Sequence, residues 1–352
     1  MRIVVDVAPL SHPRTGVGNY IRGSLIGLAG TGHEVVAFAL VSRDGRAEIE
    51  RALEGIDVES RLFEVPAAHA LRTVWSRFGR VPVERLAGAL DVFHFGDWWF
   101  PPQRGGLRST MVHDLVPLHH PEWVHARTRW MHGSKYKGVG ECDVVMVNSR
   151  FTGDDVVSTL GVAPERVHVA HPGVEPEFSP AGEWMDLGRP YLLTVATLEP
   201  RKNLDTLVAA HRLLAGDLAL AVAGAAGWGN PPVLDAPGIV RLGYTPASDL
   251  PRLYRGASVV VYPSLFEGFG MPVVEAMACG VPVVASSHPS LDEACGDAAV
   301  RADPLDSEAL AQGIRIALDR RDELVPRGLR HAASFTWGEN ARAHVEAWAA
   351  VA

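Results

Sequence analysis

The sequence predicts an α/β protein with two doubly wound parallel sheets, one in each half of the chain. Short apolar runs alternate with helix-like segments in the first half, which is the pattern of parallel βα units. The alternation restarts at Tyr191, after a stretch over 176–190 that is rich in Pro, Gly and acids. A chain of 352 residues also exceeds what one hydrophobic core usually fills. We therefore expect two Rossmann-like domains, whose ligands bind at the carboxyl ends of the strands.

Each half contains apolar runs of strand length. In the first half the predicted strands are 2–7, 34–40, 61–65, 92–95, 110–113, 144–147 and 167–170. In the second half they are 191–196, 218–223, 239–242, 258–262 and 281–285. This division predicts a first domain over 1–178 and a second over 190–336. The last segment, 337–350, is amphipathic and is predicted to be a helix.

Composition excludes several classes of protein. The formal net charge of −8 disfavours a general nucleic-acid binder, because phosphate neutralisation needs a basic surface. The three cysteines, Cys142, Cys279 and Cys295, have no metal-ligand spacing and cannot all pair, which favours a reducing compartment. The opening MRIVVDVAPL places Asp6 inside its apolar run, as a buried strand does and a signal peptide does not. No apolar run approaches the roughly 18 residues that cross a bilayer. We expect a cytoplasmic protein, with peripheral contact at the inner membrane face left open.

The stretch YPSLFEGFGMPVVEAMACGVPVV, residues 262–284, combines a strand end, a loop, a helix and the next strand. Gly268 and Gly270 let the loop take positive φ and bring N–H groups close to a ligand. Pro272 suits the first turn of a helix, and Gly280 suits its end. The helix N-terminus would face the mouth of the sheet, where its dipole favours an anion.

Two acids flank the start of that helix: Glu267 in the loop, and Glu275 about one turn into the helix. An exposed acid beside the positive end of the dipole is poorly placed to bind phosphate. It can accept hydrogen bonds from the paired hydroxyls of a sugar or a ribose. The alternative is an ordinary loop acid and a solvated helix acid. The spacing alone is common by chance, but its setting of glycines, Pro272 and an apolar strand is specific.

A pair of cations follows the first predicted strand of the second half, in TLEPRKN. Arg201 offers a planar fork and Lys202 a point charge, a combination that suits a departing diphosphate. Two cations at a helix start are mildly unfavourable because of the dipole, which raises the expectation of an anionic ligand. A solvated pair is the alternative. Glu199 is expected to orient Arg201.

The loop PRTGVGNY follows the first predicted strand and precedes a helix. Gly16 and Gly18, on either side of Val17, allow the backbone to approach a phosphate or a sugar oxygen. The third glycine of the dinucleotide fingerprint is missing, so the glycines of an ordinary tight turn are the alternative.

His113 and Asp114 lie at the carboxyl end of a predicted strand, where catalytic residues of doubly wound sheets gather. An isolated His–Asp pair is more often a structural hydrogen bond. The following His119 and His120 lack a zinc-binding pattern. The segment 123–138 interleaves basic and aromatic side chains, and could contact a membrane surface or an anionic acceptor, or be a solvated helix face.

These motifs together resemble those of retaining glycosyltransferases of family 4. The resemblance is carried by PRTGVGNY, HDLVPLHHPEW, VNSRF, HPGVEPEF, PRKNL and FEGFGMPVVEAMACGVPVVAS, and covers nearly the whole chain. Bacterial mannosyltransferases that build polysaccharides and related glycoconjugates are similar. The resemblance implies a GT-B fold, with two Rossmann-like domains facing across a cleft and a final helix, 337–352, that returns to the first domain.

The resemblance also implies a reaction. A hexose, with mannose from GDP-mannose as the leading choice and dTDP- or UDP-sugars behind it, would pass to a hydroxyl with retained configuration. The acceptor would be a saccharide, a lipid-linked molecule or a small molecule. Arg201 and Lys202 would stabilise the departing diphosphate. Glu275 would hold the ribose, Glu267 would hold hydroxyls of the donor sugar, and His113 would position that sugar.

Other positions follow from the same resemblance. The loop 223–232 could hold the base or close over it, and the glycine loop with Gly16, Val17 and Gly18 would line the cleft on the acceptor side. The remaining donor-binding positions implied are Gly268, Phe269, Gly270, Gly243 and Tyr244.

The chain departs from the family at Ala196 and Thr197, where many relatives carry Gly-Arg. One phosphate-binding arginine is therefore missing or replaced by Arg201. No Asp-x-Asp metal motif is present, and the cation pair makes a metal dispensable, so neither a metal nor a cofactor is expected. Two other functions share this architecture: a nucleotide-sugar epimerase, and a non-catalytic protein that binds nucleotide sugars.

Overall fold

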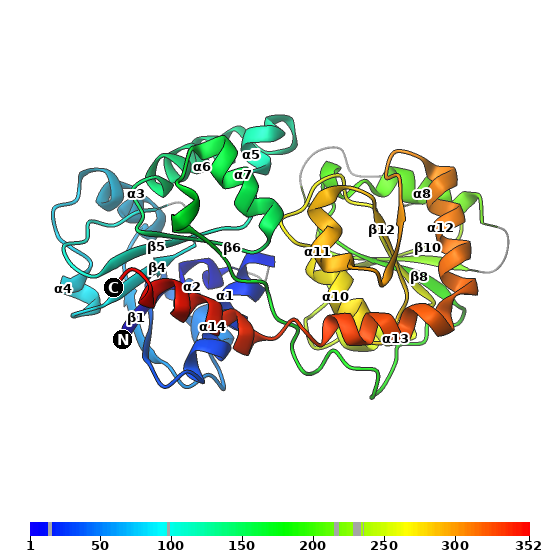
Figure 1. Ribbon diagram of the computed structural model, residues 1–352, viewed down its shortest axis with the longest axis horizontal. Helices are drawn as coiled ribbons and strands as arrows, with labels where there is room; N and C mark the ends of the chain where they lie inside the picture. The colour runs from blue at the N-terminus through cyan, green and yellow to red at the C-terminus, as the bar shows by residue number, and fades with distance from the viewer. Residues whose placement is uncertain (13–15, 97–98, 215–217, 228–233, 235) are drawn as a thin grey trace. The chain divides into compact units, whose positions relative to one another are not determined.

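The computed structural model describes residues 1–12, 16–96, 99–214, 218–227, 234 and 236–352. The chain forms two compact units (Figure 1). Unit 1 comprises Met1–Leu115, Ala126–Gly173 and Thr336–Ala352, and unit 2 comprises Val116–His125 and Val174–Phe335. Each unit is a parallel sheet covered by helices, which confirms the predicted class of two Rossmann-like α/β domains.

Unit 1 has a seven-stranded sheet in the order β3-β2-β1-β4-β5-β6-β7. All its pairings are parallel. The strand order reverses between β1 and β4, which makes the carboxyl ends of these two strands the switch point of the sheet. The strands are β1 (Arg2–Asp6), β2 (Glu34–Val41), β3 (Glu59–Glu64), β4 (Val92–Phe95), β5 (Leu107–Val112), β6 (Val144–Val147) and β7 (Val167–Val169).

Unit 2 has a six-stranded parallel sheet in the order β10-β9-β8-β11-β12-β13, and its switch point lies between β8 and β11. Apolar side chains pack on both faces of this sheet, so its strands have nearly continuous hydrophobic sequences. The strands are β8 (Tyr191–Val195), β9 (Ala219–Ala223), β10 (Ile239–Gly243), β11 (Val259–Tyr262), β12 (Val283–Ser286) and β13 (Ala299–Ala302).

Helices follow most of the strands in both units. Those of unit 1 are η1 (Ala8–Ser11), α1 (Gly16–Ala29), α2 (Arg43–Ala52), α3 (Ala68–Phe78), α4 (Glu84–Ala87), α6 (Ala126–Val139), α7 (Arg150–Leu160), η3 (Pro164–Arg166) and α14 (Trp337–Ala349). Those of unit 2 are α5 (Val116–His119), η2 (Pro121–Trp123), η4 (Pro200–Lys202), α8 (Leu204–Arg212), α9 (Leu250–Gly256), α10 (Met271–Ala278), η5 (Pro289–Leu291), α11 (Asp292–Cys295), α12 (Ser307–Asp319) and α13 (Arg321–Ala332).

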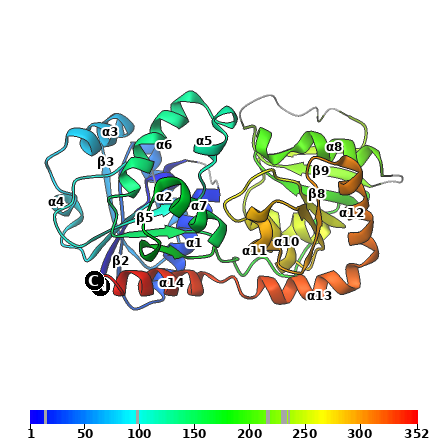
Figure 2. The ribbon, with the colours of Figure 1, turned by 45° about the horizontal axis from the view of Figure 1, so that its top comes forward.

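The C-terminal helix α14 belongs to unit 1 and packs against α1 (Figure 2). The approach is close because α1 has glycines there: a Cβ on Gly27 would lie 2.0 Å from the Trp337 carbonyl oxygen. Asn340 fixes the contact, since its Nδ2 donates to the Tyr20 hydroxyl at 2.9 Å and its Oδ1 accepts from Ser24 Oγ at 2.9 Å. The last helix is therefore tied to the first helix of the chain.

Several local expectations differ from the structure. Gly16, Val17 and Gly18 were expected in a loop but form the first turn of α1, after the intervening η1. The strand β13 was not predicted, because its sequence AVRA is short and rich in alanine. The segment 116–125, placed in the first domain from sequence, belongs to unit 2, and the units separate at Gly173 rather than near 178.

Candidate active site

Two loops meet at the switch point of unit 2. One loop follows β8 and carries Arg201 and Lys202 in η4, and the other follows β11 and carries Glu267. The two strands are parallel neighbours, so both loops leave the same edge of the sheet. Backbone pairing joins them, because the Leu265 N–H donates to the Arg201 carbonyl at 2.8 Å. The charged side chains of two distant segments are thereby brought together.

Glu267 bridges both cations. Its Oε2 accepts from Arg201 Nη1 at 2.7 Å, and its Oε1 accepts from Lys202 Nζ at 2.5 Å. Arg201 Nε also donates to Glu199 Oε2 at 2.9 Å, the contact expected from the sequence. Glu267 is 6% exposed and Lys202 7%, whereas the Arg201 side chain is 19% exposed. The cluster is a largely buried set of two cations and two carboxylates.

Tyr262, the last residue of β11, completes this cluster. Its hydroxyl accepts from Lys202 Nζ at 2.8 Å and donates to Glu267 Oε1 at 2.9 Å. The ammonium group also lies 5.0 Å from the centroid of the Tyr262 ring. On the backbone side, the Glu267 N–H donates to Ser290 Oγ at 3.0 Å. Glu267 is thus fixed both by its side chain and by its main chain.

The balance of burial and charge keeps Glu267 ionised. Burial alone would raise its pKa, but attraction from Arg201 and Lys202 outweighs this and lowers the pKa to about 2. Burial lowers the pKa of Lys202, and repulsion from Arg201 adds to this while Glu267 opposes it. From its sequence context, Glu267 was expected to be an exposed acid. That expectation is wrong, because both of its oxygens accept bonds from buried or half-buried cations.

Glu275 has a different environment. It lies in α10, is buried, and accepts a hydrogen bond from the Tyr254 hydroxyl at 2.8 Å. Burial raises its pKa to about 7; the bond from Tyr254 opposes the shift and the nearby Glu175 adds to it. Within the described part of the chain, no hydrogen bond joins Glu275 to Arg201, Lys202 or Glu267. Both glutamates therefore belong to unit 2, but only Glu267 belongs to the ion cluster.

The loop between the glutamates is shaped by one glycine. Gly270 has φ of +103° and precedes α10, and a Cβ there would lie 2.5 Å from Leu291 Cδ2. Gly268 does not share this positive φ. The Phe269 ring is buried and packs against Phe335 at a centroid distance of 5.2 Å. Phe269 thus has a core position, while Gly270 permits the turn into the helix.

The positions expected near a nucleotide base are only partly described. Gly243 has φ of +69°, and its carbonyl already accepts from the Gly224 N–H at 2.7 Å. The Tyr244 side chain is exposed. Of the expected loop 223–232, residues 228–232 lie outside the described residues.

His113 lies in unit 1, directly after β5. Burial, with repulsion from Lys135, lowers its pKa to about 3, so the imidazole is neutral at pH 7. The His113 Nε2 is inaccessible to solvent and has no hydrogen-bond partner among the described residues. Its ring contacts the Tyr20 ring edge-on, with centroids 5.0 Å apart. Gly16, Val17 and Gly18 also lie in unit 1, with Gly16 exposed and Gly18 buried.

Some residues of the site were missed from sequence. Tyr262 and Tyr254 bond the two glutamates, and Asn203 takes φ of +56° after η4. The Asn203 Nδ2 donates to the Pro263 carbonyl at 3.2 Å and so ties the β8 loop to the β11 loop. Tyr262 had a visible signal, because it is the one polar group at the end of an apolar strand. Tyr254 had none, since it lies on a separate helix.

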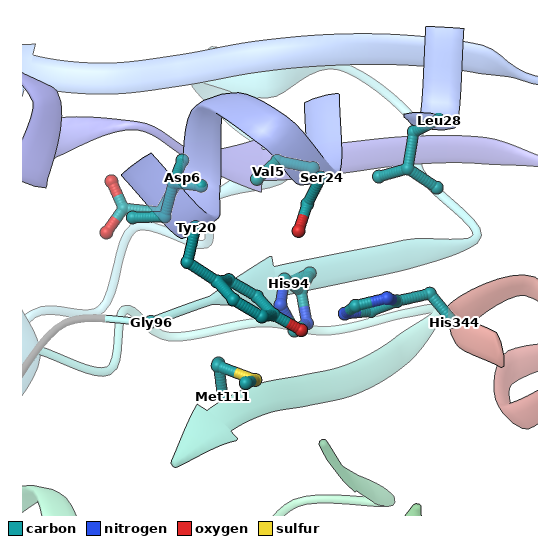
Figure 3. Close-up of a pocket in the computed structure, with 10 residues that line it drawn as sticks. Val5, Asp6, Tyr20, Ser24, Leu28, His94, Gly96, Met111 and His344 are labelled. Carbon is teal, nitrogen blue, oxygen red and sulfur yellow. The ribbon is translucent and has the colours of Figure 1, made fainter. Parts of the chain in front are cut away.

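Among the described residues at the switch point of unit 1 lies a cavity of about 10 Å³, which has room for about one water molecule and is too small for a substrate. Residues 13–15 and 97–98, near this point, lie outside the described residues. Figure 3 shows the rings of Tyr20, His94 and His344 converging beside Met111. The nearby Asp6 carboxylate accepts from the Trp99 Nε1–H at 2.7 Å.

No group of three or more His, Cys, Asp or Glu among the described residues could hold a metal ion. None of the helices in this part of the chain is long and apolar enough to cross a membrane.

Comparison with known proteins identifies the family. Residues 14–178 match the family described as Glycosyltransferase Family 4, and residues 189–320 match Glycosyl transferases group 1. O-antigen chain mannosyltransferase B of Escherichia coli is 28% identical over 96% of both chains. Among solved structures, sucrose-phosphate synthase from Thermosynechococcus elongatus has a TM-score of 0.75 at 19% identity, covering 99% of both chains. Anabaena Alr3699/HepE in complex with UDP-glucose has a TM-score of 0.72 at 16% identity, covering 99% of this chain and 100% of its own. The chain belongs to the glycosyltransferases of family 4 and has the GT-B fold that its sequence motifs predicted.

Proposed function

We propose that this glycosyltransferase moves a hexose from a nucleotide-diphosphate sugar to a hydroxyl group with retained anomeric configuration. The observation that carries the proposal is the buried cluster of Arg201, Lys202 and Glu267 at the carboxyl ends of β8 and β11. Cations at this edge of a doubly wound sheet suit a phosphorylated ligand. The donor is proposed to be GDP-mannose, which is supported by the mannosyltransferase relative. The complex of Alr3699/HepE with UDP-glucose supports a nucleotide sugar in general.

The ion cluster suggests how the donor engages. Without a ligand, Glu267 pairs with both cations and Glu199 pairs with Arg201, so neither cation is buried without a counter-ion. We propose that the diphosphate takes over N–H groups of Arg201 and Lys202. This would release Glu267 oxygens, which could then accept bonds from hydroxyls of the donor sugar. One carboxylate would thus serve as counter-ion before binding and as sugar ligand afterwards.

The chemical step follows from the same charges. The bond between the anomeric carbon and the diphosphate oxygen breaks, a bond from that carbon to the acceptor oxygen forms, and the acceptor proton passes to the departing diphosphate. Negative charge grows on the diphosphate as it leaves, and Arg201 and Lys202 stabilise that charge. His113, neutral and with an unpaired Nε2 among the described residues, is proposed to position the donor sugar. Glu275 is proposed to hold the ribose hydroxyls.

The acceptor is proposed as a saccharide, a lipid-linked molecule or a small molecule. The E. coli relative is named for an O-antigen chain, which supports a saccharide. No cofactor or metal is proposed for the reaction, and the protein is proposed to act in the cytoplasm.

A nucleotide screen followed by turnover tests this proposal. Thermal unfolding with GDP, UDP, dTDP and ADP identifies the base, because a ligand at 100 times its Kd stabilises the native state by about 2.7 kcal/mol. With the matching nucleotide sugar, free nucleotide diphosphate should appear only when an acceptor is present. Proton NMR of the product should show the anomeric configuration of the donor. An epimerised donor without acceptor, or an inverted product, would contradict the proposal.

A further inference from the structure

An exposed apolar strip runs along helix α3 of unit 1. Leu71, Val74 and Phe78 are spaced by three and four residues, so they share one face of the helix. Their exposed fractions are 42%, 55% and 77%. The adjacent face of α3 is buried and contains Ala68, Arg72 and Trp75. Large apolar side chains exposed in a row differ from the isolated ones that any protein surface carries.

The strip continues onto α6. Trp130 of α6 is 55% exposed, and the guanidinium of Arg77 in α3 lies 4.6 Å from the centre of its ring. Both ribbon views place α3 and α6 side by side (Figures 1 and 2). We call this region the α3–α6 surface. Its exposed apolar members are Leu71, Val74, Phe78, Val81 and Trp130.

The two segments that form the α3–α6 surface are basic, and acids occur only beyond their ends. Residues 65–83 and 123–140 contain no Asp or Glu, although the whole chain has a net charge of −8. Exposed cations in these two segments include Arg77, Arg80, Arg129 and Lys137. Basic and apolar groups are thus gathered on one surface of an acidic protein.

We propose that the α3–α6 surface docks on an anionic lipid bilayer. Apolar side chains flanked by Arg and Lys match the interface of such a bilayer, where the rings enter the headgroup region and the cations meet lipid phosphates. A second copy of the chain fits less well, because both sides of a symmetric contact would carry the same positive charge. The proposal does not depend on the proposed reaction.

Co-sedimentation with extruded vesicles tests this docking, with no nucleotide sugar present. We expect the protein to sediment with vesicles of mixed phosphatidylcholine and phosphatidylglycerol, and much less with phosphatidylcholine alone. Phe78→Ser should weaken binding roughly tenfold, because it removes an inserted ring. Arg80→Glu should weaken it by a similar factor, roughly tenfold, through charge reversal. Leu305→Ser is the matched control, since Leu305 is 76% exposed in unit 2.

Three results would overturn the proposal. The wild type could fail to sediment with the anionic vesicles, or could bind neutral ones equally well. Phe78→Ser could bind as the wild type does. A lipid-free dimer that Phe78→Ser dissociates would assign the surface to a second copy instead. Unchanged thermal unfolding of each variant shows that the fold is intact, and unchanged transfer to a soluble acceptor separates docking from catalysis.

Discussion

The switch points of the two sheets have the same topology but very different side chains. In unit 2, the ends of β8 and β11 carry the ion cluster of Arg201, Lys202 and Glu267. In unit 1, the described residues at the ends of β1 and β4 line a cavity of about 10 Å³, mostly with apolar groups and neutral rings. Doubly wound sheets bind ligands at such edges, and among the described residues the paired cations lie at the edge of unit 2. Residues 13–15 and 97–98 at the unit 1 edge lie outside the described residues.

The two edges differ in the contacts that their side chains make. On the unit 1 side, α14 contributes His344 to the cavity wall, and Trp348 Nε1 donates to Ser109 Oγ at 2.9 Å. These contacts fill the space with packed rings, although His344 Nε2 has no hydrogen-bond partner among the described residues. On the unit 2 side, charges are gathered at a cost in desolvation, which a fold alone would not require. The two edges thus share a topology, and the side chains give the unit 2 edge a cluster of charges.

The largest effect should come from Lys202, the buried cation of the unit 2 cluster. We expect Lys202→Ala to lower turnover by roughly 10²–10³-fold, because one stabilising charge on the leaving group is lost. Steady-state release of nucleotide diphosphate measures this. Arg212→Ala, which removes an exposed cation from α8, should leave turnover unchanged. Equal turnover by Lys202→Ala and the wild type would contradict the role proposed for the ion cluster of unit 2.

A smaller effect, on stability, is expected on the unit 1 side. Asn340→Ala removes bonds to the Tyr20 hydroxyl, the Ser24 hydroxyl and the His171 carbonyl, the last at 2.8 Å. Because Asn340 is 1% exposed, the free energy of unfolding should fall by about 2–4 kcal/mol. Chemical denaturation checks this. The exposed Arg342 of the same helix provides the control, for which Arg342→Ala should cost less than about 0.5 kcal/mol. A similar small cost for Asn340→Ala would show that α14 is not anchored as described.

Substitution of Glu275 should have the smallest of these effects, a change in stability that depends on pH. The folded pKa of Glu275, about 7, exceeds the ordinary 4.5, so between these values only the native state keeps the proton. Stability therefore falls as pH rises from 4.5 to about 7. We expect Glu275→Gln to be more stable than the wild type at about pH 8, by on the order of 1–3 kcal/mol, and nearly equal to it at about pH 5. Glu183→Gln, at an 80% exposed side chain, should show no such dependence.

Thermal unfolding across pH would measure this difference. A Glu275→Gln variant that is less stable than the wild type at high pH would mean that the carboxylate form is stabilised in the native state. That result would remove Glu275 from the set of buried, proton-holding groups.

The sequence allowed much of the site to be predicted because its signals are local. Arg201 and Lys202 directly follow an apolar strand, and Glu267 lies in a loop punctuated by glycines before a proline. Parallel strands place such loops at one edge of the sheet, so their proximity could be expected. The strand β13 escaped prediction because alanine carries little strand preference.

What the sequence could not show are the pairings between distant segments. Glu267 is the shared partner of both cations, yet it lies 66 residues after Arg201 and 65 residues after Lys202 in the sequence. Glu275 lies close to Glu267 in sequence, but its partner Tyr254 directs it to a different environment. Asn340 bonds Tyr20 across 320 residues. Such partners are determined by three-dimensional packing, and the hydrophobic periodicity of the sequence does not predict them.

Calorimetric titration of a nucleoside diphosphate into the wild type and Lys202→Ala tests the central claim most directly. The base is the one that the thermal screen selects, and the matching nucleoside without phosphates is titrated in parallel. If the unit 2 cluster binds the diphosphate, the Kd of the diphosphate should rise at least roughly tenfold in the variant while that of the nucleoside stays the same. An unchanged Kd for the diphosphate would contradict the account.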